Sequence, residues 1–215
     1  MLRFWRKKKN EPRLPELLGV TIDRAVTVDS VSIKLLPEDS LIEIPQQTFS
    51  IVAQGHCDLG EQSHLHRFYP DDDSILLQMQ GGDGIEDQRI DEIMLWSYYD
   101  VKYPGSDHLW KAIQQSIRQR TYMLNGPNCE VFYERAWFGD SDQPEEPIQY
   151  WEKVSENQTD KEPRRIFQTA MLFARELSDG KDEMLLVNME EVEGTGERSV
   201  AYMLGRSLSQ HELQT

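Results

Sequence analysis

Three histidines and one cysteine, the side chains of this sequence best suited to metal chemistry, fall within one short stretch. They are His56, Cys57, His64 and His66. The spacing of His64 and His66 at positions i and i+2 places both on one face of a β-strand, where they could share an ion. Because imidazole nitrogens are common zinc ligands, this pattern indicates a metal-dependent enzyme with a site at His56, His64 and His66.

The residues around the histidines favour a different interpretation. A cupin-type metal site would place a glutamate a few residues after the HxH pair, but Tyr69, Pro70 and Asp71 follow here. His108 and His211 stand outside any matching motif. We therefore predict that His64 and His66 are half-exposed strand residues paired with nearby acids, and we assign no metal and no other cofactor.

The remaining sequence contains no local catalytic motif. The GxSxG, HExxH, CxxC and Walker patterns are all missing. The glycines of GGDG, residues 81–84, lack the spacing of a phosphate-binding loop and are typical of a turn. Asp71, Asp72 and Asp73 lack the glycine and terminal glutamate of a calcium-binding loop. The sequence therefore favours a non-catalytic interaction protein over an enzyme, although acids from several strands could still assemble a site.

The first nine residues mix bases with apolar side chains. Apolar groups of this kind can enter a lipid interface while the bases contact anionic headgroups. We predict a tail that docks onto a protein partner or an anionic membrane surface, and a solvated, inactive start is the alternative. The residues concerned are Leu2, Arg3, Phe4, Trp5, Arg6, Lys7, Lys8 and Lys9.

The rest of the chain is strongly acidic. The whole sequence has 38 acids, 23 Lys and Arg, and a formal charge of −15. Because five of the bases lie in the first nine positions, the remainder has 18 bases and a charge of −20. A surface of this sign repels phosphate, so nucleic acid is not an expected partner.

The cysteines and the hydropathy pattern indicate the compartment. Cys57 and Cys129 are far apart and have no CxxC spacing, so we expect free thiols in a reducing environment. Pro12 and Pro15 follow the basic start where a signal peptide would have its apolar region. No apolar run is long enough to span a membrane. These observations predict a cytoplasmic protein, free or peripheral at the inner face of the membrane.

Most of the chain alternates apolar and polar residues with the period of β-strands. An Asp179-Gly180 turn of type I′ character joins the runs at 165–177 and 184–189. The pattern predicts a mainly β to α+β fold with antiparallel sheets. The expected strands lie at residues 20–28, 31–35, 41–44, 49–54, 64–69, 75–79, 89–103, 118–124, 129–138, 148–154, 165–177, 184–189 and 200–204.

One amphipathic helix is expected between two β-rich halves. Ser106 can cap it, and Leu109, Trp110, Ile113 and Ile117 form an apolar stripe at helical spacing. We expect a flexible tail at 1–19, one globular body at 20–207 and a second tail at 208–215. The body divides into possible halves, 20–105 and 118–207, joined by the helix near 106–117.

Four segments carry a resemblance to a known family. They are the basic aromatic start with NEP, LPE and LG, the GHCDLG turn, the segment HRFYPDDDSILLQMQGG and the closing VAYMLGRSLS. Together they resemble the YjfK-like family of uncharacterised bacterial proteins over nearly the whole chain. The resemblance implies a bacterial cytoplasmic protein and transfers no catalytic residue. Gene neighbours in that family resemble phage-shock proteins, which implies a membrane-stress component as the protein partner.

Overall fold

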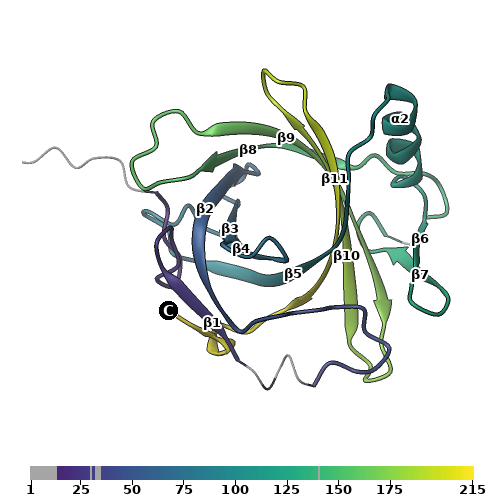
Figure 1. The fold of residues 1–215 in the computed structure, drawn as a ribbon, viewed down its shortest axis with the longest axis horizontal. Helices are drawn as coiled ribbons and strands as arrows, with labels where there is room; N and C mark the ends of the chain where they lie inside the picture. The colour runs from purple at the N-terminus through teal and green to yellow at the C-terminus, as the bar shows by residue number, and fades with distance from the viewer. Residues whose placement is uncertain (1–13, 30, 32–34, 140) are drawn as a thin grey trace, which may run out of the picture.

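The computed structural model describes residues 14–29, 31, 35–139 and 141–215, and about half of them lie in antiparallel strands (Figure 1). The helices are α2 (Asp107–Ser116) and the short 3-10 helix η1 (Gln210–Glu212). The strands are β1 (Ala25–Val28), β2 (Thr48–Asp58), β3 (His64–Pro70), β4 (Ile75–Gly81), β5 (Ile90–Lys102), β6 (Thr121–Asn125), β7 (Glu130–Arg135), β8 (Ile148–Ser155), β9 (Arg164–Glu176), β10 (Asp182–Val192), β11 (Arg198–Ser207) and β12 (Leu213–Gln214).

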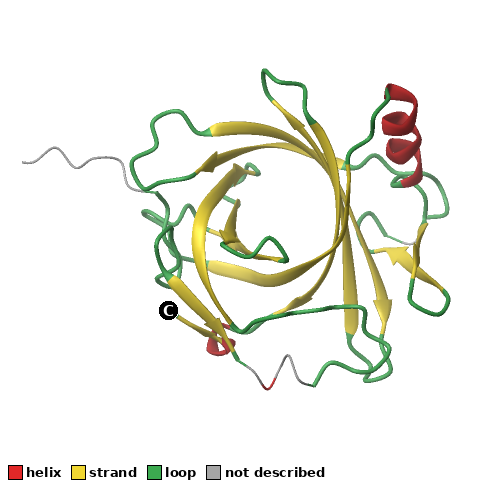
Figure 2. Cartoon of the chain, viewed as in Figure 1, coloured by secondary structure: helices red, strands yellow, loops and turns green. Residues whose placement is uncertain are grey.

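Eight of these strands close into a barrel, which confirms the mainly β prediction. The order around the barrel is β2, β3, β4, β5, β11, β10, β9 and β8, and β8 pairs again with β2. Figure 2 shows these strands as a ring seen end on. The segments before and after α2 form one sheet, because β5 pairs with β11 and β8 pairs with β2.

Alternate residues of each strand face the barrel interior, as the period of a strand requires. Each of the eight strands contributes at least one side chain to a single buried cluster inside. That cluster contains Cys57, Leu65, Leu76, Met94, Trp96, Tyr150, Ala170, Leu186, Ala201 and Met203.

The outer wall of β2 to β5 is also buried, because the N-terminal segment crosses it. Leu17 and Val20 are fully buried against outward-facing residues such as Phe68 and Leu95. Residues 1–19 were expected to be a tail, but residues 14–19 belong to this cover. At the other end of the chain β12 pairs with β1, so residues 208–215 also pack on the barrel.

The outer wall of β9 to β11 is covered by α2 and the β6–β7 hairpin. The predicted helix is confirmed, and the Ser106 side chain accepts a hydrogen bond from the Leu109 N–H at 3.3 Å. Trp110 and Ile117 pack in the same cluster as Phe173. Because β10 is covered on both faces, its sequence from Met184 to Met189 is a nearly continuous apolar run.

Four local predictions differ from the structure. Of the strand expected at 20–28, only Ala25–Val28 is extended, because Asp23 has φ of 66° in a turn. At 31–35 the Leu35 N–H donates to the Val31 carbonyl, which is a helical turn; residues 32–34 lie outside the described part. Residues 41–44 pair with no strand. Gly180 has the predicted positive φ of 76°, but Asp179 does not, so the turn is not type I′.

Candidate functional site

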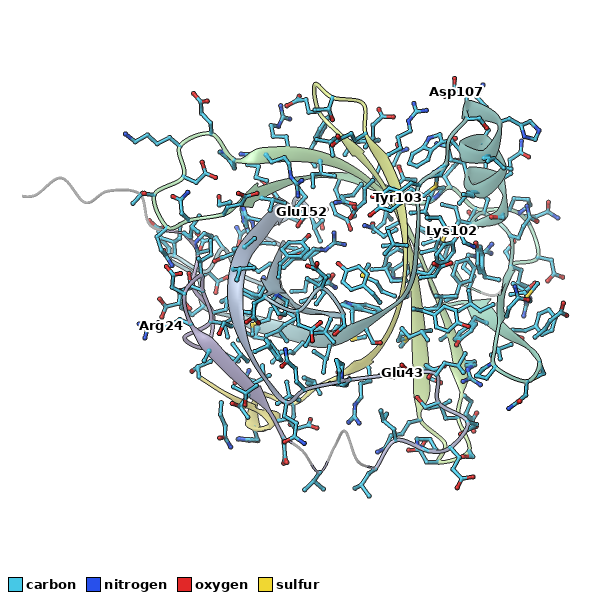
Figure 3. All side chains as sticks on the ribbon, viewed as in Figure 1. Arg24, Glu43, Lys102, Tyr103, Asp107 and Glu152 are labelled. Atoms are coloured by element: carbon cyan, nitrogen blue, oxygen red, sulfur yellow. The ribbon has the colours of Figure 1, made fainter. Side chains whose placement is uncertain are left out.

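A buried ion pair crosses the barrel interior between β3 and β8. Arg67 is 1% exposed and Glu152 is fully buried, and Arg67 Nη1 donates to Glu152 Oε2 at 2.9 Å. Arg67 Nη2 donates to the Tyr150 hydroxyl at 2.7 Å, and the Tyr69 hydroxyl donates to Glu152 Oε1 at 2.7 Å. Figure 3 shows Glu152 inside the ring of strands. The two charges therefore neutralise each other away from water.

The backbone of β2 leaves room for this carboxylate. A Cβ built on Gly55 would lie 1.8 Å from Glu152 Oε1, so any larger residue would displace the carboxylate. Gly55 is consequently a positioning residue of the interior ion pair.

The network continues toward one end of the barrel through two amides. Gln168 Nε2 donates to Glu152 Oε2 at 2.7 Å, and Asn188 Nδ2 donates to Gln168 Oε1 at 2.7 Å and to Glu190 Oε1 at 3.0 Å. The Ser199 hydroxyl donates to Glu190 Oε2 at 2.9 Å. Both amide orientations are fixed, because carboxylates can only accept.

That end of the barrel opens into a cavity of about 390 Å³, which we call the tyrosine mouth. Burial raises the pKa of Glu190, and the charge of Glu152 raises it further. Burial followed by the charge of Glu190 raises the pKa of Tyr98, so its phenol stays neutral. The lining includes Tyr69, Tyr98, Tyr103, Glu190, Asp73 and Arg164.

A second cavity lies on the other side of the ion pair, with a volume of about 100 Å³. Trp96, Met94 and Leu186 give it mainly apolar walls. The indole N–H of Trp96 is buried and has no hydrogen-bond partner among the described residues. Polar and charged side chains interrupt the apolar lining of this cavity at Arg67, Gln78, Gln80 and Glu92.

The barrel wall is open between β2 and β8, at a place we call the seam. The two strands pair only at Gln54 to His56, facing Lys153 to Ser155. Beyond these three residue pairs the strands diverge and line a surface cavity of about 730 Å³. Leu59 and Tyr150 border both this cavity and the apolar interior cavity. The seam cavity and the interior cavity therefore adjoin each other at these side chains.

Trp151 stands at the seam with 40% of its surface exposed. Its ring packs on Phe167, with centroids 5.1 Å apart, and the Arg165 guanidinium lies 4.5 Å from its centroid. Both neighbours lie on β9, the strand that pairs with β8. The indole is therefore held in place while remaining open to a partner.

The three predicted histidines do meet, on the outer wall of β2 and β3. Their ring centroids lie 5.1 to 6.4 Å apart, and His56 Nε2 is 3.2 Å from His64 Nδ1. His66 is fully buried and donates from Nε2 to the Gly82 carbonyl at 2.9 Å, so the half-exposed position predicted for it is wrong.

Burial disfavours the charged form of two of the three histidines, His56 and His66. Burial, followed by the nearby His66 and His64, lowers the pKa of His56 to about 4. Burial also lowers the pKa of His66. Across the described ranges, no group of three or more His, Cys, Asp or Glu is placed to hold a metal ion. The metal-dependent enzyme, our alternative, therefore gains no support from the geometry of this cluster.

The other predicted residues are distributed as follows. The docking residues Leu2 to Lys9 lie outside the described part of the chain. Cys57 faces the barrel interior and Cys129 is exposed, and both are free thiols. Sequence reasoning missed Arg67, Glu152 and Glu190. One sequence feature could have indicated them: each charged residue lies on the strand face that mainly carries apolar or aromatic side chains. Arg67, for example, lies on one face of β3 between Leu65 and Tyr69.

The fold and the interior together define an eight-stranded antiparallel barrel with a charged core and two openings. The family model described as "Protein of unknown function (DUF2491)" matches residues 1–214, and the chain belongs to this family. It is 30% identical over 190 residues to the "Uncharacterized protein YjfK" of Escherichia coli (strain K12), covering 86% of this chain and 82% of that protein. The YjfK-like resemblance is thereby confirmed. No solved structure matches the chain.

In the described part of the chain, no helix is long and apolar enough to cross a membrane.

Proposed function

We propose that this protein is a non-catalytic interaction module that binds an extended segment of a protein partner at the seam. The observation that carries the proposal is the early end of the β2–β8 pairing beside an exposed, rigidly held Trp151. Residues 148–152 of β8 pair with β9 on one side, and no described strand pairs with them on the other.

An unpaired strand edge can bind another chain by main-chain hydrogen bonds. The seam adds side-chain contacts of the kind found at binding hot spots, because Trp151 and Leu59 are large, apolar and partly exposed. Trp151 loses little freedom on binding, since Phe167 and Arg165 already hold its ring. An extended peptide with an apolar side chain at the Trp151 position fits these features.

The test is affinity capture from native bacterial lysate with the full chain and two single variants. Trp151→Ala removes the seam anchor, whereas Phe132→Ala removes an exposed aromatic of β7 that is 60% exposed and away from the seam. We expect Trp151→Ala to weaken binding of the captured protein at least tenfold, about 1.4 kcal/mol, and Phe132→Ala to retain it. Equal capture by all three proteins contradicts the proposal, as does capture of no protein by the unaltered chain.

The same proposal includes peripheral attachment of a cytoplasmic protein to the inner face of the membrane. Its support is the sequence of residues 2–9, where five bases accompany Leu2, Phe4 and Trp5. Each base near an anionic surface contributes about 1 kcal/mol, roughly 5 kcal/mol before the ordering of the tail is subtracted. Attachment of this strength is weak and reversible. The family resemblance adds a membrane-stress component as the expected class of protein partner.

Vesicle co-sedimentation tests the attachment. We expect the full chain to pellet with anionic vesicles, less so as salt increases, and to stay in solution with neutral vesicles. A chain lacking residues 2–9 should not pellet with either. Equal pelleting of the two chains would show that the basic start has no part in membrane binding.

A further inference from the structure

The charges inside the barrel do not balance at the tyrosine mouth. Arg67 pairs with Glu152 at 2.9 Å, and no described basic side chain forms an ion pair with Glu190. Glu190 instead accepts from three neutral groups, the Asn188 amide at 3.0 Å, the Ser199 hydroxyl at 2.9 Å and the Gln168 amide at 3.5 Å. The positive charge that acts on Glu190 comes from Arg67, which is already paired with Glu152, so Glu190 has no cation of its own among the described residues.

Hydrogen-bond donors are also in short supply along this network. Asn188 is fully buried and turns its Nδ2 toward Gln168 and Glu190, which leaves its Oδ1 without a donor among the described residues. Reversing the amide would place its oxygen against a carboxylate, so the orphaned acceptor is a consequence of the network itself. Of the two groups, only Glu190 lines the mouth, so a cation with N–H donors bound there would supply the missing positive charge beside Glu190.

The walls of the mouth suit a cation with an organic body. Tyr69 and Tyr98 line the cavity beside Glu190, and Tyr103 lies at its rim at the end of β5 with 76% of its surface exposed (Figure 3). The faces of neutral phenol rings attract cations. The rim adds one carboxylate, Asp73, and one guanidinium, Arg164, so the lining as a whole remains negative. A volume of about 390 Å³ is sufficient for a small organic molecule.

We propose that the tyrosine mouth is a binding site for a small organic ammonium ion, with Glu190 as its counter-ion and the rings of Tyr69 and Tyr98 as its walls. The site is distinct from the seam, because the cavities of the mouth and the seam share no lining residue. Binding of an ammonium ion at the mouth can therefore be tested independently of partner binding at Trp151.

A nuclear magnetic resonance titration of the full chain with three probes of similar size tests the charge requirement. The probes are butylammonium, butan-1-ol and butanoate. We expect butylammonium to bind at least about tenfold more tightly than butan-1-ol and to shift the signals of Tyr98 and Ser199, while butanoate does not bind. Equal affinity for the ammonium ion and the alcohol overturns the proposal, because it indicates an apolar pocket. Preference for butanoate indicates an anion site at Arg164 and also overturns the proposal. Failure of all three probes to bind overturns it as well.

Two substitutions test the counter-ion. Glu190→Gln keeps the shape and should lower the affinity for butylammonium to that for butan-1-ol, about tenfold. Glu197→Gln alters an exposed acid of the turn between β10 and β11 and should leave the affinity unchanged. Unchanged affinity in folded Glu190→Gln contradicts the assignment. Butylammonium binding should also strengthen as the pH rises and Glu190 ionises, and this pH dependence should vanish in Glu190→Gln.

The aromatic wall gives a second, independent variant pair if Glu190→Gln does not fold. Tyr98→Phe keeps the ring, so butylammonium should bind within about twofold of the unaltered chain. Tyr98→Leu removes the ring face and should weaken binding severalfold. The same affinity for Tyr98→Phe and Tyr98→Leu would show that the ring face contributes nothing and would overturn the proposed cation site.

Discussion

Replacing Glu152 by Gln should lower the free energy of unfolding by about 3–5 kcal/mol, the usual effect of removing one partner of a buried ion pair. The substitution leaves the Arg67 guanidinium, 1% exposed, without a negative partner. Tyr69, Arg67 and Gln168 all donate hydrogen bonds to the Glu152 carboxylate. In the glutamine variant an amide nitrogen, which cannot accept, faces some of these donors. Urea unfolding near neutral pH measures the change.

Two further proteins separate the charge effect from loss of shape. Glu156→Gln, an exposed acid just after β8, should change stability by less than about 0.5 kcal/mol. The double variant Arg67→Met with Glu152→Gln removes the unpaired charge and should be more stable than Glu152→Gln alone. If Glu152→Gln is instead as stable as the unaltered chain, water reaches Arg67 and the barrel interior is not dry.

Local patterns in the sequence were sufficient for the elements that depend on neighbouring residues. The helix near 106–117 follows from its cap at Ser106 and its apolar stripe, and the helix begins where this cap predicts. The antiparallel meander of β9, β10 and β11 follows from turn residues between alternating runs. In each case the information lies within a few residues of the structure it specifies.

Closure of the barrel could not be predicted in the same way. The decisive pairing joins Gln54 to Ser155, which are far apart in the chain, and no turn between them sets the register. Alternation was also misleading at 31–35, where the Leu35 N–H donates to the Val31 carbonyl in a helical turn. Residues 41–44 are held by contacts with the distant β10 instead of by pairing with a neighbouring strand.

In the candidate site, too, contacts between neighbouring residues could be predicted from the sequence, and contacts between distant strands could not. The i and i+2 spacing brought His64 and His66 together with His56 as expected. The Gly82 carbonyl, 16 residues away in the chain, accepts from His66 Nε2, and the spacing of the histidines does not predict this contact. The pairing of Arg67 with Glu152 depends on barrel closure, so neither residue could be assigned a partner from its own strand.

Replacing Glu183 by Gln is the second substitution with a large expected effect, about 2–4 kcal/mol of lost stability. Glu183 is fully buried on β10 and accepts from four groups: Arg175 Nε at 2.8 Å, the Tyr133 hydroxyl at 2.7 Å, the Ser40 hydroxyl at 2.7 Å and the Leu41 N–H at 2.7 Å. One carboxylate thus joins β7 and the segment before β2 to β9 and β10 of the barrel.

The loss should be smaller than for Glu152→Gln, because Arg175 is partly exposed and can recover hydration that buried Arg67 cannot. Glu176→Gln, an exposed residue beside Arg175, serves as the control and should remain within about 0.5 kcal/mol of the unaltered chain. Amide hydrogen exchange provides a second measurement, in which the Leu41 N–H of Glu183→Gln should lose its protection before the barrel strands do. Protection of Leu41 that persists in Glu183→Gln would show that the apolar contacts of Leu41 and Ile42, rather than the carboxylate, hold this segment on the barrel.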